Sequence, residues 1–98
     1  MKIRFLEIAW EELEDVVGYY RGQAQDLEIS FMQEIAAALK LIMDFPDAWQ
    51  PFHVGTRRCL LRRFPYGIIY KRFNDEILIL AVVHLHRLPD YWIDRLPQ

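Results

Sequence analysis

The sequence predicts an α+β domain with the element order β-α-α-β-β-β, in which a helical hairpin packs on a mainly antiparallel four-stranded sheet. Two consecutive segments carry apolar residues at helical spacing, and the connection between them is so short that the helices must lie antiparallel. Short segments rich in β-branched and aromatic residues then follow one another within residues 57–84. A chain of 98 residues suffices for one compact domain, so we expect a single domain over residues 1–98.

The first strand and the first helix follow from a change of periodicity near residue 9. Residues 2–8 alternate between apolar and charged side chains, which is typical of a short strand. A helical pattern follows and ends near Gly22, with acidic residues on the faces away from its apolar stripe. Acidic side chains in the first turns of a helix are stabilised by the positive end of the helix dipole. The apolar stripe of this helix is Trp10, Leu13, Val17 and Tyr20.

The second helix is predicted from Gln25 or Asp26 to Phe45. The run of alanines at 36–38 permits a close approach to its neighbour, and Pro46 ends the helix. Proline and glycine residues at 46–56 indicate a loop. The predicted apolar stripe is Leu27, Phe31, Ile35, Ala38, Leu39 and Ile42.

Three further strands are predicted at residues 57–63, 67–73 and 76–84. Asn74 and Asp75 make a two-residue turn between the last two strands, which predicts an antiparallel hairpin. Pro89 prevents the last strand from continuing, and residues 91–96 are expected to form a short helical or irregular tail.

Composition favours a cytoplasmic protein that does not span a membrane. The longest apolar run is Ile77–Val83, far below the ~20 residues that a membrane helix needs. The amino terminus has no apolar core typical of a secretory signal. Cys59 is the single cysteine, which excludes an internal disulfide and suits a reducing compartment.

The net charge of −2 conceals two halves of opposite sign. Residues 1–48 hold four basic and ten acidic residues, whereas residues 49–98 hold eight basic and four acidic ones. The balances are −6 and +4, so the basic second half either meets a polyanion or an acidic partner or reflects ordinary solvated surfaces. A balance of +4 is weak for a nucleic-acid-binding protein.

Two sequence motifs resemble those of a known family. The turn between the first two carboxy-terminal strands reads Arg63-Phe64-Pro65-Tyr66-Gly67, and the chain closes on His84-x-x-Arg87-x-Pro89-x-Tyr91-Trp92. Together with the order of the elements, these motifs resemble the RelE/ParE superfamily of toxins from type II toxin–antitoxin modules, which includes plasmid stabilization proteins. The resemblance implies a small cytoplasmic toxin that inhibits growth and is neutralised by a cognate antitoxin.

The resemblance leaves three functions open. ParE-like members poison DNA gyrase by binding it and are not thought to be hydrolases, whereas RelE-like members are ribosome-dependent endoribonucleases that cleave mRNA. The third alternative is an inactive toxin fold that only binds an antitoxin. RelE-like nucleases tend to carry a lysine-rich face, but this chain has three lysines and a pI of about 5.9, which favours a ParE-like protein.

If the chain is a nuclease, its expected catalytic residues are His84, Arg87, Arg62 and Tyr91. Histidine titrates in the range that proton transfer requires, arginine binds phosphate with two parallel hydrogen bonds, and a tyrosine can stack on a base or donate a proton. The structural alternatives are a buried histidine, an ion pair of Arg87 with Asp90 or Asp94, and a hydrophobic lid over the helices formed by Tyr91 and Trp92.

The expected antitoxin- or target-binding residues are Arg57, Arg58, Arg62, Arg63 and Trp92. Strand alternation sends the members of each arginine pair to opposite faces, so at most half of them can line one groove. The groove beside the two helices offers apolar anchors to an antitoxin, and a toxin–antitoxin complex offers a route to oligomers. We expect no cofactor, and the pair His84-x-His86 lacks the further ligand that a zinc site needs.

Overall fold

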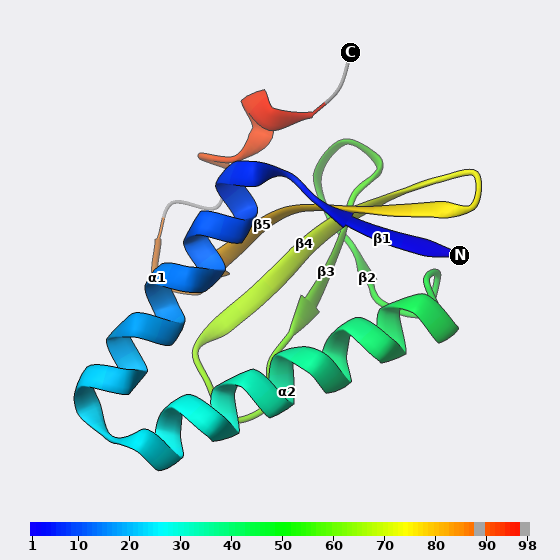
Figure 1. Cartoon of the computed structure of the whole chain (residues 1–98). Helices are drawn as coiled ribbons and strands as arrows, with labels where there is room; N and C mark the ends of the chain where they lie inside the picture. Colours follow the sequence, from blue (N-terminus) through cyan, green and yellow to red (C-terminus); the bar gives the residue numbers. More distant parts are fainter. Residues whose placement is uncertain (88–89, 97–98) are drawn as a thin grey trace.

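The structure, a computed structural model, describes residues 1–87 and 90–96 as two helices on one face of a sheet (Figure 1). The mixed architecture and the β-α-α-β order confirm the predicted α+β class. None of the helices in these ranges is long and apolar enough to cross a membrane. The elements are β1 (Lys2–Phe5), α1 (Glu7–Gln23), α2 (Gln25–Asp44), β2 (Gln50–Pro51), β3 (Arg57–Leu60), β4 (Tyr66–Phe73) and β5 (Glu76–His84), with one-turn 3₁₀ helices η1 (His53–Gly55) and η2 (Ile93–Arg95).

The sheet has five strands in the order β1-β5-β4-β3-β2, one more than predicted. Strand β1 pairs parallel with β5, and the other neighbours are antiparallel. The additional strand, β2, has two residues, one of them a proline, and it lies within the segment 46–56 that was predicted to be a loop. The predicted hairpin of β4 and β5 is confirmed, with Asn74 at a positive φ of 49° in its turn.

Two strands end earlier than predicted. Strand β1 stops at Phe5 because helix α1 begins at Glu7, so Ile8 belongs to the helix. Strand β3 stops at Leu60 instead of Arg63 because the Glu34 carboxylate of α2 accepts the backbone N–H groups of both Arg62 and Arg63. These contacts draw the chain out of the sheet and toward the helix.

The main core lies between the helices and the sheet. Phe31 of α2 is fully buried, and its ring lies 5.2 Å from that of Phe64 and 5.3 Å from that of Tyr20. The predicted stripe of α2 is confirmed at Phe31, Ile35, Ala38 and Ile42. Trp10 and Leu27 are exposed, contrary to the prediction, because the buried side of α1 is the row Ala9, Leu13 and Val16 and because Leu27 lies in the first turn of α2.

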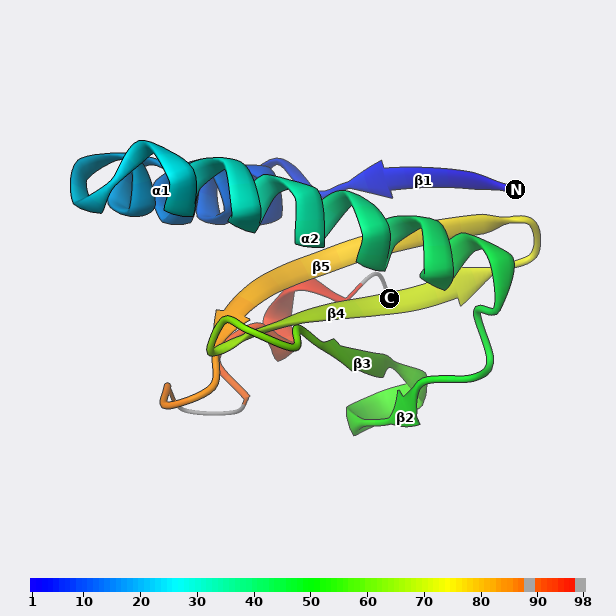
Figure 2. The same cartoon turned by 90° about the horizontal axis from the view of Figure 1, so that it is seen from below.

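A second, smaller core lies on the opposite face of the sheet. Trp92 is fully buried there and stacks on Phe52 at a centroid distance of 5.8 Å. The carboxy-terminal tail and the segment after β2 cover this face, whereas both helices lie on the other (Figure 2). The predicted lid at Trp92 therefore covers the face of the sheet away from the helices, not the helices themselves.

Candidate functional site

Four of the predicted site residues meet near the carboxyl end of β5: Arg58, His84, Arg87 and the buried Trp92. Arg58, His84 and Arg87 line a small hollow of about 30 Å³ on the face of the sheet away from the helices. The Arg58 guanidinium lies 4.6 Å from the centre of the Phe52 ring. Its Nε atom is buried and has no hydrogen-bond partner within residues 1–87 and 90–96.

His84 is held by its neighbours. Its Nδ1 atom accepts a hydrogen bond of 3.1 Å from the backbone N–H of His86, and its ring lies edge-on to Tyr66 at 5.0 Å. Because Nδ1 is the acceptor, the neutral imidazole carries its proton on Nε2. The histidine therefore presents an N–H donor, not a free base, to a group approaching from the Nε2 side.

Arg87 and Tyr91 form a stacked pair. The Arg87 guanidinium lies 4.3 Å from the centre of the Tyr91 ring, a cation–π geometry. In the described part of the chain Arg87 makes no ion pair, so the pairing with Asp90 or Asp94 considered from the sequence is wrong. The exposed side of Arg87 stays available to a partner.

Glu12 connects the tail to the sheet and was missed by the sequence analysis. Its carboxylate accepts hydrogen bonds from the Tyr91 hydroxyl at 3.1 Å, from the backbone N–H of Val82 at 3.1 Å and from both terminal nitrogens of Arg95 at 2.8 and 2.9 Å. Burial first, and then the Glu12 charge, raise the pKa of Tyr91 to about 12. Tyr91 is therefore a poor proton donor near neutral pH.

Acidic side chains also flank the site on the helix side. A hollow of about 170 Å³ beside His84 and Arg87 is lined by Glu12 and Asp15 as well as by Tyr66. Arg95 balances the Glu12 charge, so Asp15 is the carboxylate here that repels a phosphate approaching the arginine.

The four arginines at and after β3 point to different places. Arg57 and Arg58 face opposite sides of the sheet, as alternation predicts: Arg57 donates to the Trp49 carbonyl at 2.7 Å, whereas Arg58 stacks on Phe52. Arg62 and Arg63 lie beyond the strand, exposed beside α2. The structure thus brings Arg58 to His84 and Arg87 and leaves Arg62 elsewhere. Trp92, being fully buried, offers no surface to a partner.

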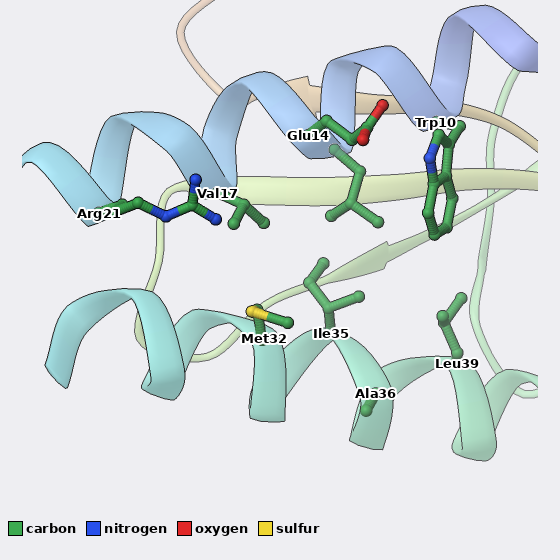
Figure 3. Close-up of a pocket in the computed structure, with 9 residues that line it drawn as sticks. Trp10, Glu14, Val17, Arg21, Met32, Ile35, Ala36 and Leu39 are labelled. Atoms are coloured by element: carbon green, nitrogen blue, oxygen red, sulfur yellow. The ribbon is translucent and has the colours of Figure 1, made fainter. Parts of the chain in front are cut away.

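An apolar groove runs between α1 and α2, as Figure 3 shows. Its volume is about 420 Å³, and Trp10 and Met32 line it with 48% and 52% of their surface exposed. Glu14 and Arg21 add charged groups to the lining. Exposed apolar side chains gathered in a groove are typical of a surface that binds an amphipathic segment.

Comparison with known proteins identifies the family. The model of the ParE toxin of the type II toxin–antitoxin system parDE matches residues 3–89, so the chain belongs to this toxin family. A solved structure described as the chromosomal ParDE TA system from P. aeruginosa is similar to it, with a TM-score of 0.75 and 21% sequence identity. The similarity covers 88% of this chain and 97% of the other, and at this identity it shows the shared fold. No curated protein sequence matches at a significant level.

Membership of this family makes the protein a ParE-type toxin of a type II toxin–antitoxin system, with an antitoxin as its partner. The RelE/ParE resemblance read from the sequence motifs is confirmed.

Proposed function

We propose that this toxin inhibits growth by binding a protein target, DNA gyrase. The observation that carries the proposal is the match of the ParE toxin model over residues 3–89, since ParE-like toxins are the gyrase-directed branch of the superfamily. The exposed corner after β5 is the surface that we assign to the target. It presents Leu85, of which 40% is exposed, beside the stacked guanidinium of Arg87.

The state of the groups around this corner supports a protein target over RNA cleavage. A ribonuclease needs a base, an acid and cations around one phosphate. Here His84 has its Nδ1 lone pair occupied, the Tyr91 hydroxyl is bound to Glu12, and the pKa of Tyr91 is raised to about 12. Arg62, the other cation expected of a nuclease, lies beside α2 and away from His84.

A ribosome-dependent endoribonuclease is the second candidate, and one observation favours it: Arg58, His84 and Arg87 line a common hollow. Two guanidinium groups and an imidazole are groups that can stabilise the pentacoordinate phosphorane formed during RNA cleavage. Catalysis by this trio would require the His86 backbone to release Nδ1, or His84 to act as an acid through Nε2.

Expression of the chain in a bacterial host, with growth, a DNA-damage reporter and mRNA integrity followed together, tests these functions. Gyrase poisoning predicts arrest with the reporter induced and mRNA intact. Cleaved mRNA with a silent reporter would replace our proposal with the nuclease. Absence of arrest from a folded, well-expressed chain would leave only antitoxin binding.

Two substitutions sharpen this experiment. His84→Gln preserves a side-chain acceptor and donor but cannot shuttle protons, so the nuclease predicts loss of arrest and gyrase binding predicts that much of it remains. Arg87→Ala removes the exposed cation and should weaken arrest by a gyrase poison. Arg4→Ala, an exposed arginine on β1 at the far edge of the sheet, is the matched control.

The same family membership supports a proposal for antitoxin binding. The groove between α1 and α2 offers apolar anchors, and Arg58 and Arg62 offer cations to an acidic antitoxin. The double variant Arg58→Glu, Arg62→Glu should associate with its antitoxin about tenfold more slowly at low salt. An unchanged association rate would show that these two arginines do not contribute to association with the antitoxin.

A further inference from the structure

The Glu12 carboxylate is fixed to the sheet as well as to the tail. Strand β1 pairs with β5 only as far as Ile79, so Val82 lies beyond the end of this pairing. Glu12 reaches across from α1 and accepts the Val82 N–H at 3.1 Å. The Glu12 side chain is only 16% exposed. Its carboxylate therefore has a defined place on β5, independent of the contacts that it makes with the tail.

Arg95 binds this carboxylate with two parallel hydrogen bonds. Its terminal nitrogens donate to the two oxygens of Glu12 at 2.8 and 2.9 Å, and one of them also donates to the Leu80 carbonyl of β5 at 3.0 Å. A paired contact of this kind fixes the orientation of the guanidinium as well as its distance. Only 13% of the Arg95 side chain is exposed, so water competes little for these bonds. The end of the tail is thus tied to one point on β5.

Tyr91 connects this ion pair to Arg87. The Tyr91 hydroxyl donates to Glu12 at 3.1 Å, and the Arg95 guanidinium lies 5.2 Å from the centre of the Tyr91 ring. The same ring carries the Arg87 guanidinium at 4.3 Å, a cation–π contact. Glu12 holds the hydroxyl end of Tyr91, and the ring in turn offers Arg87 a surface of fixed position.

Arg87 depends on this ring for the position of its side chain. Its backbone is placed by a turn, in which the Arg87 N–H donates to the His84 carbonyl at 3.1 Å. The side chain is exposed, and within residues 1–87 and 90–96 it forms no ion pair. An exposed arginine has many rotamers, and ordering them on binding costs affinity unless a contact orders the side chain beforehand. The stack on Tyr91 provides this order.

We propose that Glu12 is a positioning residue for target recognition, which orients Arg87 through Tyr91 and does not touch the target. The inference rests on the function proposed above, because Arg87 belongs to the corner that we assign to DNA gyrase. Arg95 takes part by holding the Glu12 carboxylate against the tail. A largely buried side chain of α1 thus sets the affinity of an exposed residue beyond the end of β5.

The first test measures the affinity of the purified toxin for DNA gyrase. Glu12→Gln keeps the size of the side chain but removes the charge that orients Arg95. We expect the population of the stacked Arg87 pose to fall to about a tenth, which weakens the affinity about tenfold. An unchanged affinity would overturn the proposal.

Asp15→Asn is the matched control for charge. Asp15 is exposed and lines the same hollow beside Arg87, but it lies outside the contacts that Glu12 makes with the tail. The affinity of Asp15→Asn for gyrase should stay within about twofold of the wild-type value, because water screens an exposed carboxylate. Equal losses in Glu12→Gln and Asp15→Asn would assign the effect to local charge and overturn the positioning role.

A double-mutant cycle shows whether Glu12 acts through Arg87. Arg87→Ala alone should weaken gyrase binding. Adding Glu12→Gln to Arg87→Ala should cause no further loss, because the side chain that Glu12 positions is already absent. A general loosening of the tail would instead lower the affinity by the same factor in both backgrounds. That outcome would make Glu12 a structural residue only and would overturn the proposal.

NMR of the toxin alone tests the positioning without gyrase. Side-chain protons of Arg87 that lie over the Tyr91 ring are shifted upfield by its ring current. In Glu12→Gln these signals should move toward their positions in Tyr91→Leu, which has no ring. Unchanged signals would overturn the proposal. If the wild-type toxin does not bind gyrase, the target assignment fails, and this comparison alone decides the role of Glu12.

Arg95→Lys is a milder variant that keeps the positive charge of the tail. An ammonium group cannot reproduce the planar pair of hydrogen bonds that the guanidinium makes with Glu12. The Arg87 signals and the gyrase affinity should therefore change in the same direction as in Glu12→Gln and by a smaller amount, while circular dichroism shows folded helices. Wild-type values of both in folded Arg95→Lys would overturn the role that we assign to Arg95.

Discussion

The two faces of the sheet are covered by different means. On the helix face, two helices of 17 and 20 residues bury a continuous apolar core around Phe31. On the other face, a short tail with a single one-turn helix is held by the buried Trp92, by the partly buried Tyr91, Ile93 and Leu96, and by the polar contacts of Glu12. The first covering is extensive and apolar, whereas the second is small and depends on a few directional bonds.

This difference between the two faces indicates which part of the molecule can open locally while the rest of the domain stays folded. Apolar packing spread over two long helices is lost only when the domain unfolds, while a short tail with few apolar contacts and one bonded carboxylate can open locally. The candidate target-binding corner at Arg87 belongs to the second region, because Arg87 stacks on Tyr91 of the tail. Its geometry therefore depends on Glu12, which lies on α1.

The largest effect is expected on the helix face. Phe31→Ala removes a fully buried ring that contacts Phe64 and Tyr20, and it should lower the free energy of unfolding by about 3–5 kcal/mol. Chemical denaturation followed by circular dichroism measures this loss. Met32→Ala, exposed on the same helix, is the control and should cost far less. Equal losses would contradict the assignment of the main core.

Opening of the tail should follow from Glu12→Gln. The Arg95 side chain is 13% exposed, and it would lose the charge that compensates it, at a cost of about 2 kcal/mol. Trypsin should then cut after Arg87 and Arg95 much faster, while the helices stay folded by circular dichroism. Glu14→Gln, an exposed neighbour on α1, should leave both properties unchanged. Trypsin sensitivity unchanged in Glu12→Gln would show that apolar packing around Trp92 holds the tail without Glu12.

Tyr91 gives the tail a dependence on alkaline pH. Its pKa is raised from 10.0 to about 12, mainly by burial, so the folded state favours the neutral phenol. This contribution is complete below pH 10 and is lost as the pH rises from about 10 to about 12. Tyr91→Phe removes the hydrogen bond to Glu12, at a cost of about 1 kcal/mol near neutral pH, and it also removes this part of the pH dependence. Denaturation of both proteins across this range checks it, and parallel curves would contradict the assignment.

The contrast between the faces also explains which features the sequence predicts. Both helices and the β4–β5 hairpin follow from local signals, namely helical spacing and the Asn74-Asp75 turn. The role of Glu12 does not, because a glutamate among several acids on an exposed helix resembles a solvated residue. It accepts the Val82 N–H because β1 ends at Phe5 and leaves that part of β5 without a neighbouring strand. The two residues are 70 positions apart, and no local pattern reports such a contact.

The candidate site was predictable to a similar degree. His84, Arg87 and Tyr91 do lie close together near the end of β5, as their spacing in the motif indicates. Arg62 does not join them, because Glu34 ends β3 early and directs the following turn toward α2. A helix residue 28 positions away thus determines where the arginine lies.

The smallest effect is expected at an exposed ion pair, which contrasts with the largely buried pair of Glu12 and Arg95. Lys40 and Asp44 form an ion pair on α2 at 3.3 Å, with side chains 78% and 47% exposed. Lys40→Ala should change the free energy of unfolding by less than about 0.5 kcal/mol, because water screens an exposed pair and competes for both charges. The Glu12–Arg95 pair has a shorter separation of 2.8 Å, its side chains are 16% and 13% exposed, and the same carboxylate also binds Val82 and Tyr91. Denaturation of Lys40→Ala beside Glu12→Gln measures the difference directly. Equal costs would mean that burial does not strengthen the tail contact, and the idea that Glu12 positions the corner at Arg87 would fall with it.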